Sequence, residues 1–143
     1  MKETKSIMIV GVGGQGTLLA SRILGNVFIG AGYDVKVSEV HGMSQRGGRD
    51  RKINPMPVIT GAAEYPAGIK EKLAKTADVT AVDAQRFAEE AGNIKAVNVV
   101  LIGLLAKNTE IPHDAWLETI KKTVPAKFLD VNIKAFELGY SVE

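Results

Sequence analysis

A short apolar run followed by a turn crowded with glycines constrains the fold more than any other feature of the sequence. Residues 7–10 are continuously apolar, which suits a strand buried on both faces of a parallel sheet. Gly11, Gly13, Gly14 and Gly16 follow at once, and three of them fit the spacing G-x-G-x-x-G. Helical apolar spacing resumes after Gly16, so the pattern predicts strand, turn and helix, the first half of a βαβ unit.

The glycine turn has both a functional and a structural interpretation. Glycines allow a tight turn and close approach of a ligand, and the helix that follows offers unpaired N–H groups to an anion. The same residues also serve a tight strand–helix connection that binds nothing. Gln15 stands at the expected helix start, where it either caps the helix or contacts a partner.

An alternating stretch over residues 35–39 predicts a second short strand that ends at Glu39. Glu39 lies roughly twenty residues beyond the turn, where a dinucleotide-binding fold places its ribose-binding acid. Glu39 therefore either accepts a hydrogen bond from a ribose hydroxyl or pairs with Arg46. An exposed pair of that kind contributes less than about 1 kcal/mol, so stability alone explains it poorly.

Residues 40–52 have no periodicity and are rich in glycine and cationic side chains, so we expect a loop. Arg46 is the strongest functional candidate, because a guanidinium beside glycines forks onto a phosphate or carboxylate with little obstruction. A structural salt bridge is the alternative for Arg46. His41 either packs within the loop or acts as a general base, which would need a partner carboxylate. The remaining candidates for ligand or partner binding in this loop are Gly42, Gln45, Gly47 and Gly48.

Apolar spacing in the remainder of the sequence predicts mostly helices. The first helix should cover residues 15–29 and stop at Gly32. His113 should lie near a helix start, and Trp116 should pack in the core or an interface. Further expected elements are helices over residues 66–75, 84–91, 96–107, 112–124 and 131–138, with a strand over residues 77–83.

Composition narrows the classes of function. The chain has 143 residues, which favours one domain over residues 1–143, and its net charge of +2 argues against nucleic-acid or membrane binding. Cysteine is absent, which excludes disulfides and cysteine-ligated iron–sulfur clusters. His41 and His113 have no ligand cluster around them, so no metal site is expected. With no signal peptide or membrane-length apolar run, we expect a cytoplasmic protein.

Taken together, these motifs give the chain a specific resemblance. It resembles the gamma-type subunits of 2-oxoacid:ferredoxin oxidoreductases, and is most similar to the beta subunit of the indolepyruvate type. The similarity rests on the glycine turn together with the stretch EVHGMSQRGG over residues 39–48. Further similar residues are Asp83-Ala84, Gly92-Asn93 and the stretches 95–98 and 134–140.

One departure from the family pattern concerns the middle of the chain. In the family, a strand and a further strand–helix–strand segment follow Arg-Gly-Gly before the region that matches Pro57 and Val58. Here only residues 49–56 stand in between, so the chain is shortened between Gly48 and Pro57. It is either a natural shortened member, an engineered deletion, or a chain that recruits a partner's strands. The expected fold is accordingly α/β, a shortened Rossmann-like fold with a mainly parallel sheet and flanking helices.

The resemblance implies a supporting role in a larger enzyme. Such enzymes convert a 2-oxoacid, coenzyme A and oxidised ferredoxin into an acyl-CoA, carbon dioxide and reduced ferredoxin. Thiamine diphosphate and iron–sulfur clusters are expected in the large partner subunit, with no cofactor bound by this chain, whose isolated form is expected to be inactive. Arg46 would then contact coenzyme A phosphates or a carboxylate of the partner. The alternatives are a stand-alone dinucleotide-binding protein and an inactive interaction module.

Overall fold

The computed structural model describes residues 3–9, 16–38, 60–61, 64 and 67–142. The chain divides into two compact units, each of which we describe by itself. The helical unit comprises Met1–Val37 and Asp83–Glu143, and the middle unit comprises Ser38–Val82. The expected single domain over residues 1–143 stays a prediction.

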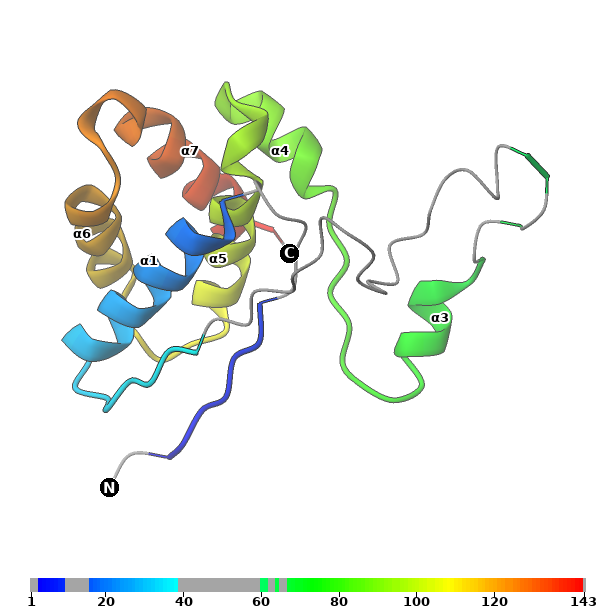
Figure 1. Ribbon diagram of the computed structural model, residues 1–143, viewed down its shortest axis with the longest axis horizontal. Helices are drawn as coiled ribbons and strands as arrows, with labels where there is room; N and C mark the ends of the chain where they lie inside the picture. The colour runs from blue at the N-terminus through cyan, green and yellow to red at the C-terminus, as the bar shows by residue number, and fades with distance from the viewer. Residues whose placement is uncertain (1–2, 10–15, 39–59, 62–63, 65–66, 143) are drawn as a thin grey trace. The chain divides into compact units, whose positions relative to one another are not determined.

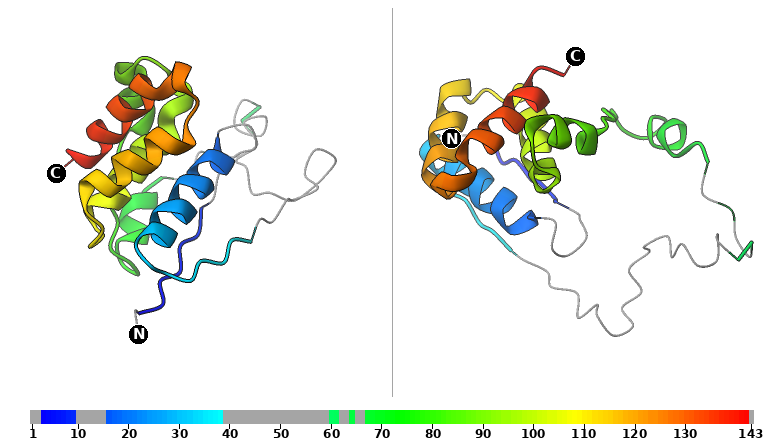
Figure 2. Two further views of the ribbon diagram at one scale, coloured as in Figure 1. Left: turned by 90° about the vertical axis from the view of Figure 1, so that its left-hand side faces the viewer. Right: turned by 90° about the horizontal axis from the view of Figure 1, so that it is seen from above.

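Helices that pack directly on one another build the helical unit (Figure 1). α7 packs against α5 and α4, and α1 packs against α6 and α5. The two further views in Figure 2 show the same side-by-side arrangement of helices. The elements are α1 (Thr17–Gly30), α4 (Ala84–Ala91), η1 (Ile94–Ala96), α5 (Val97–Lys107), α6 (His113–Thr123), η2 (Ala126–Phe128) and α7 (Leu129–Tyr140).

Local sequence signals account for most of these boundaries. The Asp83 side chain accepts a hydrogen bond from the Arg86 N–H at 3.0 Å, which caps the start of α4. Gly92 ends the same helix in the left-handed conformation with φ +107°. The expected helix over residues 84–91 is confirmed, and His113 begins α6 as predicted.

Two glycines set the closest approach between helices, where α5 crosses α7. A Cβ added to Gly139 would lie 2.7 Å from the carbonyl carbon of Val100, and one added to Gly103 would lie 2.8 Å from the Tyr140 nitrogen. Because these neighbours are backbone atoms, no side-chain rotation could relieve the overlap. The expectation that the last helix stops before Gly139 is wrong, since α7 continues to Tyr140 and Gly139 serves this contact.

Aromatic side chains fill the centre of the helical unit. Trp116 and Phe136 are completely buried, with ring centroids 6.3 Å apart. Phe28 of α1 meets the Trp116 ring edge-on, also at 6.3 Å. Trp116 is therefore a core residue, one of the two roles expected for it. Its indole N–H has no hydrogen-bond partner within the described part of the chain, which lowers stability.

The middle unit contains one short helix among its described residues, α3 (Ile69–Leu73), which begins after Gly68. This helix falls inside the expected range of residues 66–75. Ile69 and Leu73 remain about half exposed, at 46% and 49%. The helix was predicted correctly, but its apolar face is not buried among the described residues.

The prediction of an α/β, Rossmann-like fold with a mainly parallel sheet is wrong for the described residues. Helices and extended segments occur there, and no strand. The expected strands over residues 7–10, 35–39 and 77–83 are unpaired wherever they are described, and Val10 and Glu39 lie outside that part. A buried strand is stable only when neighbouring strands satisfy its backbone and helices cover its faces. The apolar helix surfaces pack on one another instead.

No helix among the described residues is long and apolar enough to cross a membrane.

The α5–α7 crossing can be tested by adding one methyl group. We expect Gly103→Ala and Gly139→Ala each to lower the free energy of unfolding by roughly 2–3 kcal/mol, because a backbone must move in each case. Urea unfolding followed through Trp116, the only tryptophan of the chain, measures this. Gly25→Ala is the matched control, since its added Cβ makes an ordinary 3.7 Å contact with Val37. Equal stability of all three variants would contradict the tight crossing.

Candidate functional site

Of the site residues predicted from the sequence, the described part of the chain contains Gly16. The structure therefore places Gly16 and leaves the other assignments as predictions. The predicted site residues outside the described part are Gly11, Gly13, Gly14, Gln15, Glu39, His41, Gly42, Gln45, Arg46, Gly47 and Gly48.

Gly16 occupies a backbone conformation that favours glycine. Its φ of 77° and ψ of 22° are left-handed, and it stands at the N-cap position of α1. Its carbonyl accepts a hydrogen bond from the Ala20 N–H at 3.2 Å, so the helix starts directly behind the turn. The expected start of this helix at residue 15 lies just ahead of the observed start at Thr17. The geometry thus favours a glycine here, whatever the turn binds.

The N-terminus of α1 lies next to the N-terminus of α5. A Cβ on Gly16 would lie 3.8 Å from the Asn98 side-chain nitrogen and 3.9 Å from the Lys95 carbonyl oxygen. Neither helix has an acidic residue in its first turn. The start of α5 continues from η1, whose N–H groups are already hydrogen-bonded, so it is the N-terminus of α1 that favours a negatively charged group here. Sequence reasoning did not predict the proximity of Asn98, because the two helices are far apart along the chain.

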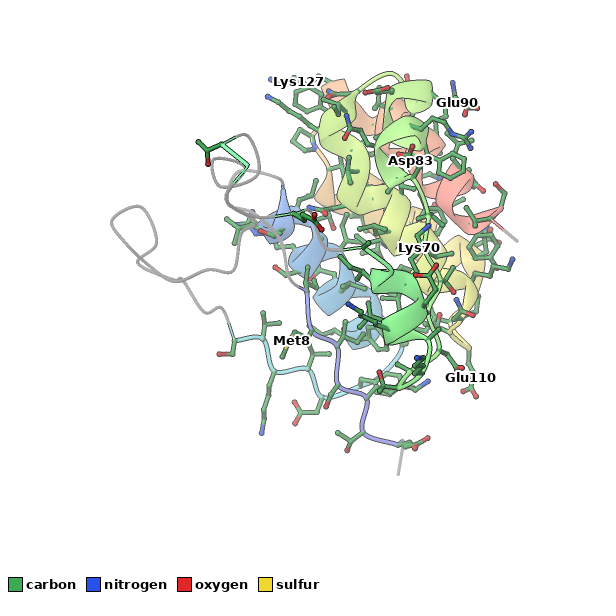
Figure 3. All side chains as sticks on the ribbon, turned by 90° about the vertical axis from the view of Figure 1, so that its right-hand side faces the viewer. Met8, Lys70, Asp83, Glu90, Glu110 and Lys127 are labelled. Atoms are coloured by element: carbon green, nitrogen blue, oxygen red, sulfur yellow. The ribbon has the colours of Figure 1, made fainter. Side chains whose placement is uncertain are left out.

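The segment before α5 is shaped by a side-chain cap. Asn93 accepts a hydrogen bond from the Lys95 N–H at 3.0 Å and so begins η1. Lys134 of α7 donates to the Glu90 carbonyl oxygen at 2.6 Å, which ties α7 to the end of α4. Figure 3 labels Asp83 and Glu90, which lie near the two ends of α4. Several residues that carry the family resemblance thus hold the helices in place.

A hollow of about 370 Å³ lies at the opposite end of α1. Its lining includes Glu3, Lys5, Tyr33, Glu110 and Pro112. The fourteen residues of α1 span about 21 Å at 1.5 Å per residue, so this hollow is separate from the turn at Gly16. It brings together one cation and two carboxylates and contains none of the predicted site residues.

His113 links two helices. Its Nε2 atom lies 3.1 Å from both carboxylate oxygens of Glu137, and its ring meets Tyr140 edge-on at 4.7 Å. Asp114 stands 3.6 Å from the other ring nitrogen. These contacts join the start of α6 to α7. No group of three metal-ligating side chains occurs among the described residues.

The Glu118 carboxyl group is not suited to act as a general acid. Lys121 donates a hydrogen bond to its carboxylate at 2.9 Å, and this bond with the ammonium charge lowers the pKa of Glu118. A general acid at neutral pH needs the opposite shift. Because the folded-state pKa is lowered, the small benefit of this surface pair is lost as the pH falls through that pKa.

Comparison with known proteins places the chain in a family. Residues 6–51 and 52–142 match the family described as pyruvate ferredoxin/flavodoxin oxidoreductase. The chain belongs to this family. No solved structure matches the chain.

The most informative relatives are archaeal proteins, each named indolepyruvate oxidoreductase subunit IorB. The Thermococcus kodakarensis protein is 36% identical over 193 aligned positions, covering 97% of this chain and 95% of the relative. The Pyrococcus horikoshii protein is 35% identical over 195 positions, with the same coverage. The Archaeoglobus fulgidus protein is 31% identical over 188 positions, covering 95% of this chain and 94% of the relative. The resemblance to the indolepyruvate type is therefore confirmed.

These alignments are longer than the chain itself. The alignment with the Thermococcus protein exceeds the 143 residues by fifty, so at least that many of its positions have no counterpart here. The two segments that match the family adjoin one another at Arg51 and Lys52. The match is interrupted there, although no residue of the chain is skipped. The positions that the chain lacks therefore belong at this junction, between Gly48 and Pro57.

The left-handed N-cap of α1 can be tested directly. We expect Gly16→Ala to lower the free energy of unfolding by about 1–2 kcal/mol, because a Cβ strains a residue at positive φ. Gly16→Asn should recover part of that loss, since asparagine tolerates this conformation and also caps helices. Urea unfolding monitored through Trp116 gives both values. Finding Gly16→Ala as stable as the parent chain would show that this conformation is not required.

Proposed function

We propose that this chain is the small subunit of an indolepyruvate-type 2-oxoacid ferredoxin oxidoreductase. In this role it supports the coenzyme A-dependent oxidative decarboxylation of aryl-2-oxoacids, with electrons passed to ferredoxin. The observation that carries the proposal is the similarity, over almost the whole chain, to proteins named indolepyruvate oxidoreductase subunit IorB. That name describes the relatives as subunits, so we extend to this chain a large catalytic partner.

We assign the cofactors to the partner subunit. The chain has no cysteine, the residue that usually ligates iron–sulfur clusters, so we assign the clusters to the partner. Thiamine diphosphate, also assigned to the partner, would stabilise the carbanion that decarboxylation requires. This chain would then contribute contacts to substrate, to coenzyme A or to the partner's active-site region.

We assign those contacts to the glycine turn and, as a separate element, to residues 39–48. The N-terminus of α1 behind Gly16 supports this, because a helix N-terminus favours an anion such as a coenzyme A phosphate. Arg46, within residues 39–48, supplies the fixed positive charge in this proposal. A guanidinium binds phosphate or carboxylate through two parallel hydrogen bonds, which an isolated helix terminus does not provide.

Arg46→Ala tests the assignment of that charge. We expect the variant to raise the apparent KM for coenzyme A about tenfold or more in the assembled enzyme, because a charge-assisted hydrogen bond to phosphate is lost. Oxoacid-dependent ferredoxin reduction measures this, and Trp116 emission checks that the helical unit is folded. Arg49→Ala is the matched control, since Arg49 belongs to the same expected loop over residues 40–52 but lies outside residues 39–48. Unchanged kinetics for Arg46→Ala would refute the assignment.

The subunit role itself is tested by purification. The tagged chain is isolated from the anaerobically grown cells that produce it, and its partners are identified by mass analysis and a visible spectrum. A stoichiometric large partner with brown iron–sulfur absorbance, active with arylpyruvates, is the expected result. A colourless chain without a partner would overturn the proposal. Nucleotide binding by that chain would then indicate a stand-alone dinucleotide-binding protein, and no binding would indicate an inactive interaction module.

A further inference from the structure

Two extended segments of the helical unit expose apolar side chains. Residues 3–9 precede the glycine turn, and Met8 is 87% exposed with Ile7 and Ile9 at 44% and 40%. Residues 33–37 follow α1, and Val37 is 59% exposed. A soluble protein exposes single apolar side chains routinely, but a series of them on neighbouring segments indicates a surface that something covers.

These two segments lie beside the same helix. Glu3 and Lys5 line one hollow together with Ala31 and Tyr33, which places the start of the first segment at the end of α1. The Val37 side chain lies 3.7 Å from the position of a Cβ built on Gly25, in the middle of α1. Figure 1 shows the segments in dark blue and cyan, and Figure 3 labels Met8 on the first.

α1 itself adds apolar side chains away from its buried face. Its core face is continuous and includes Ile23 and Val27, whereas Leu18 is 49% exposed and Ile29 is 59% exposed. We call the exposed side chains of the two extended segments the acceptor surface. It consists of Ile7, Met8, Ile9 and Val37.

The backbone of the first segment is also available for pairing. Within the described part of the chain, residues 3–9 make no hydrogen bond to any other segment. An extended backbone with free donors and acceptors and apolar side chains is what a second polypeptide recognises when it aligns alongside. The acceptor surface therefore combines main-chain hydrogen-bonding capacity with apolar area.

The alignments with relatives indicate what covers this surface. At least fifty aligned positions of the Thermococcus relative have no counterpart here, and the family match breaks between Arg51 and Lys52. We propose that the acceptor surface binds, in trans, a polypeptide of about fifty residues equivalent to those absent positions. A second copy of this chain is a poorer occupant, because it lacks the same positions. The inference does not depend on the proposed function.

The experiment uses the full chain and a synthetic peptide that spans the Thermococcus positions without a counterpart. Titration calorimetry measures binding, and hydrogen exchange reports which amides become protected. We expect a 1:1 complex in which the amides of residues 7–9 and Val37 exchange at least about tenfold more slowly, because pairing removes them from water. A peptide of the same composition in scrambled order should not bind.

Substitutions identify the surface. We expect Met8→Asp and Val37→Asp each to weaken peptide binding about tenfold or more, since a carboxylate replaces an apolar side chain that binding buries. Phe128→Asp is the matched control, because Phe128 is 41% exposed at the start of α7 and lies outside the surface. All three side chains are exposed, so the helical unit should stay folded, as Trp116 emission verifies.

Three results would overturn the inference. The first is that the peptide does not bind, although Trp116 emission shows that the helical unit is folded. The second is binding that neither aspartate variant weakens. The third is a dimer of the chain alone, found by sedimentation, in which the amides of residues 7–9 are already protected, since a second copy would then occupy the surface. None of these outcomes bears on whether a large catalytic partner co-purifies, so the two proposals fail separately.

Discussion

The close crossing of α5 and α7 is the contact on which the helical unit depends. Gly103 and Gly139 let two backbones meet where any larger residue would force them apart. That distance brings Val100 and Phe136 into full burial, and Trp116 of α6 then stacks on Phe136. α7 in turn holds two other elements, α4 through Lys134 and α6 through Glu137. A shift at the crossing would therefore reach most of the unit.

This dependence explains why several motif residues of the C-terminal half have structural roles. Asp83 caps α4, Gly92 ends it, and Asn93 starts the following turn. Gly139 belongs to the stretch over residues 134–140 that resembles the family, and it makes the helix crossing. The residues of this half that resemble the family therefore cap, end or pack the helices. The turn and residues 39–48 carry the part of the resemblance for which we propose a functional role.

The sequence allows helices to be predicted well because their signals are local. The bounds of α4 agree with the expectation to the residue, since an aspartate N-cap and a left-handed glycine lie at its ends. The end of α7 was predicted wrongly because a glycine in a helix was interpreted as a stop. Only the distant residue Val100 explains why Gly139 is there. Contacts between elements far apart in sequence leave no local pattern to interpret.

The same reasoning separates what could be predicted of the candidate site from what could not. The glycine at the helix start was predicted, because left-handed turns favour glycine and the spacing of the motif identifies it. The proximity of the start of α5 was not predicted, since no local pattern around Asn98 indicates a contact with Gly16. The roles of Arg46 and Glu39 depend on partners across space, so sequence reasoning provides them only as hypotheses.

The error about the sheet comes from how strand patterns are interpreted. Apolar periodicity and short alternating runs describe what each segment would bury, but a strand forms only when a neighbour supplies hydrogen bonds. The alignment with the Thermococcus relative includes at least fifty positions that have no counterpart in this chain. The helices need none of those positions, because their caps, their apolar periodicity and the glycine crossing all lie within the residues present. The extended segments around α1 have no such internal support. In our proposal their exposed isoleucines, methionine and valine are what the absent positions would cover, whereas the helical core is complete among the residues present.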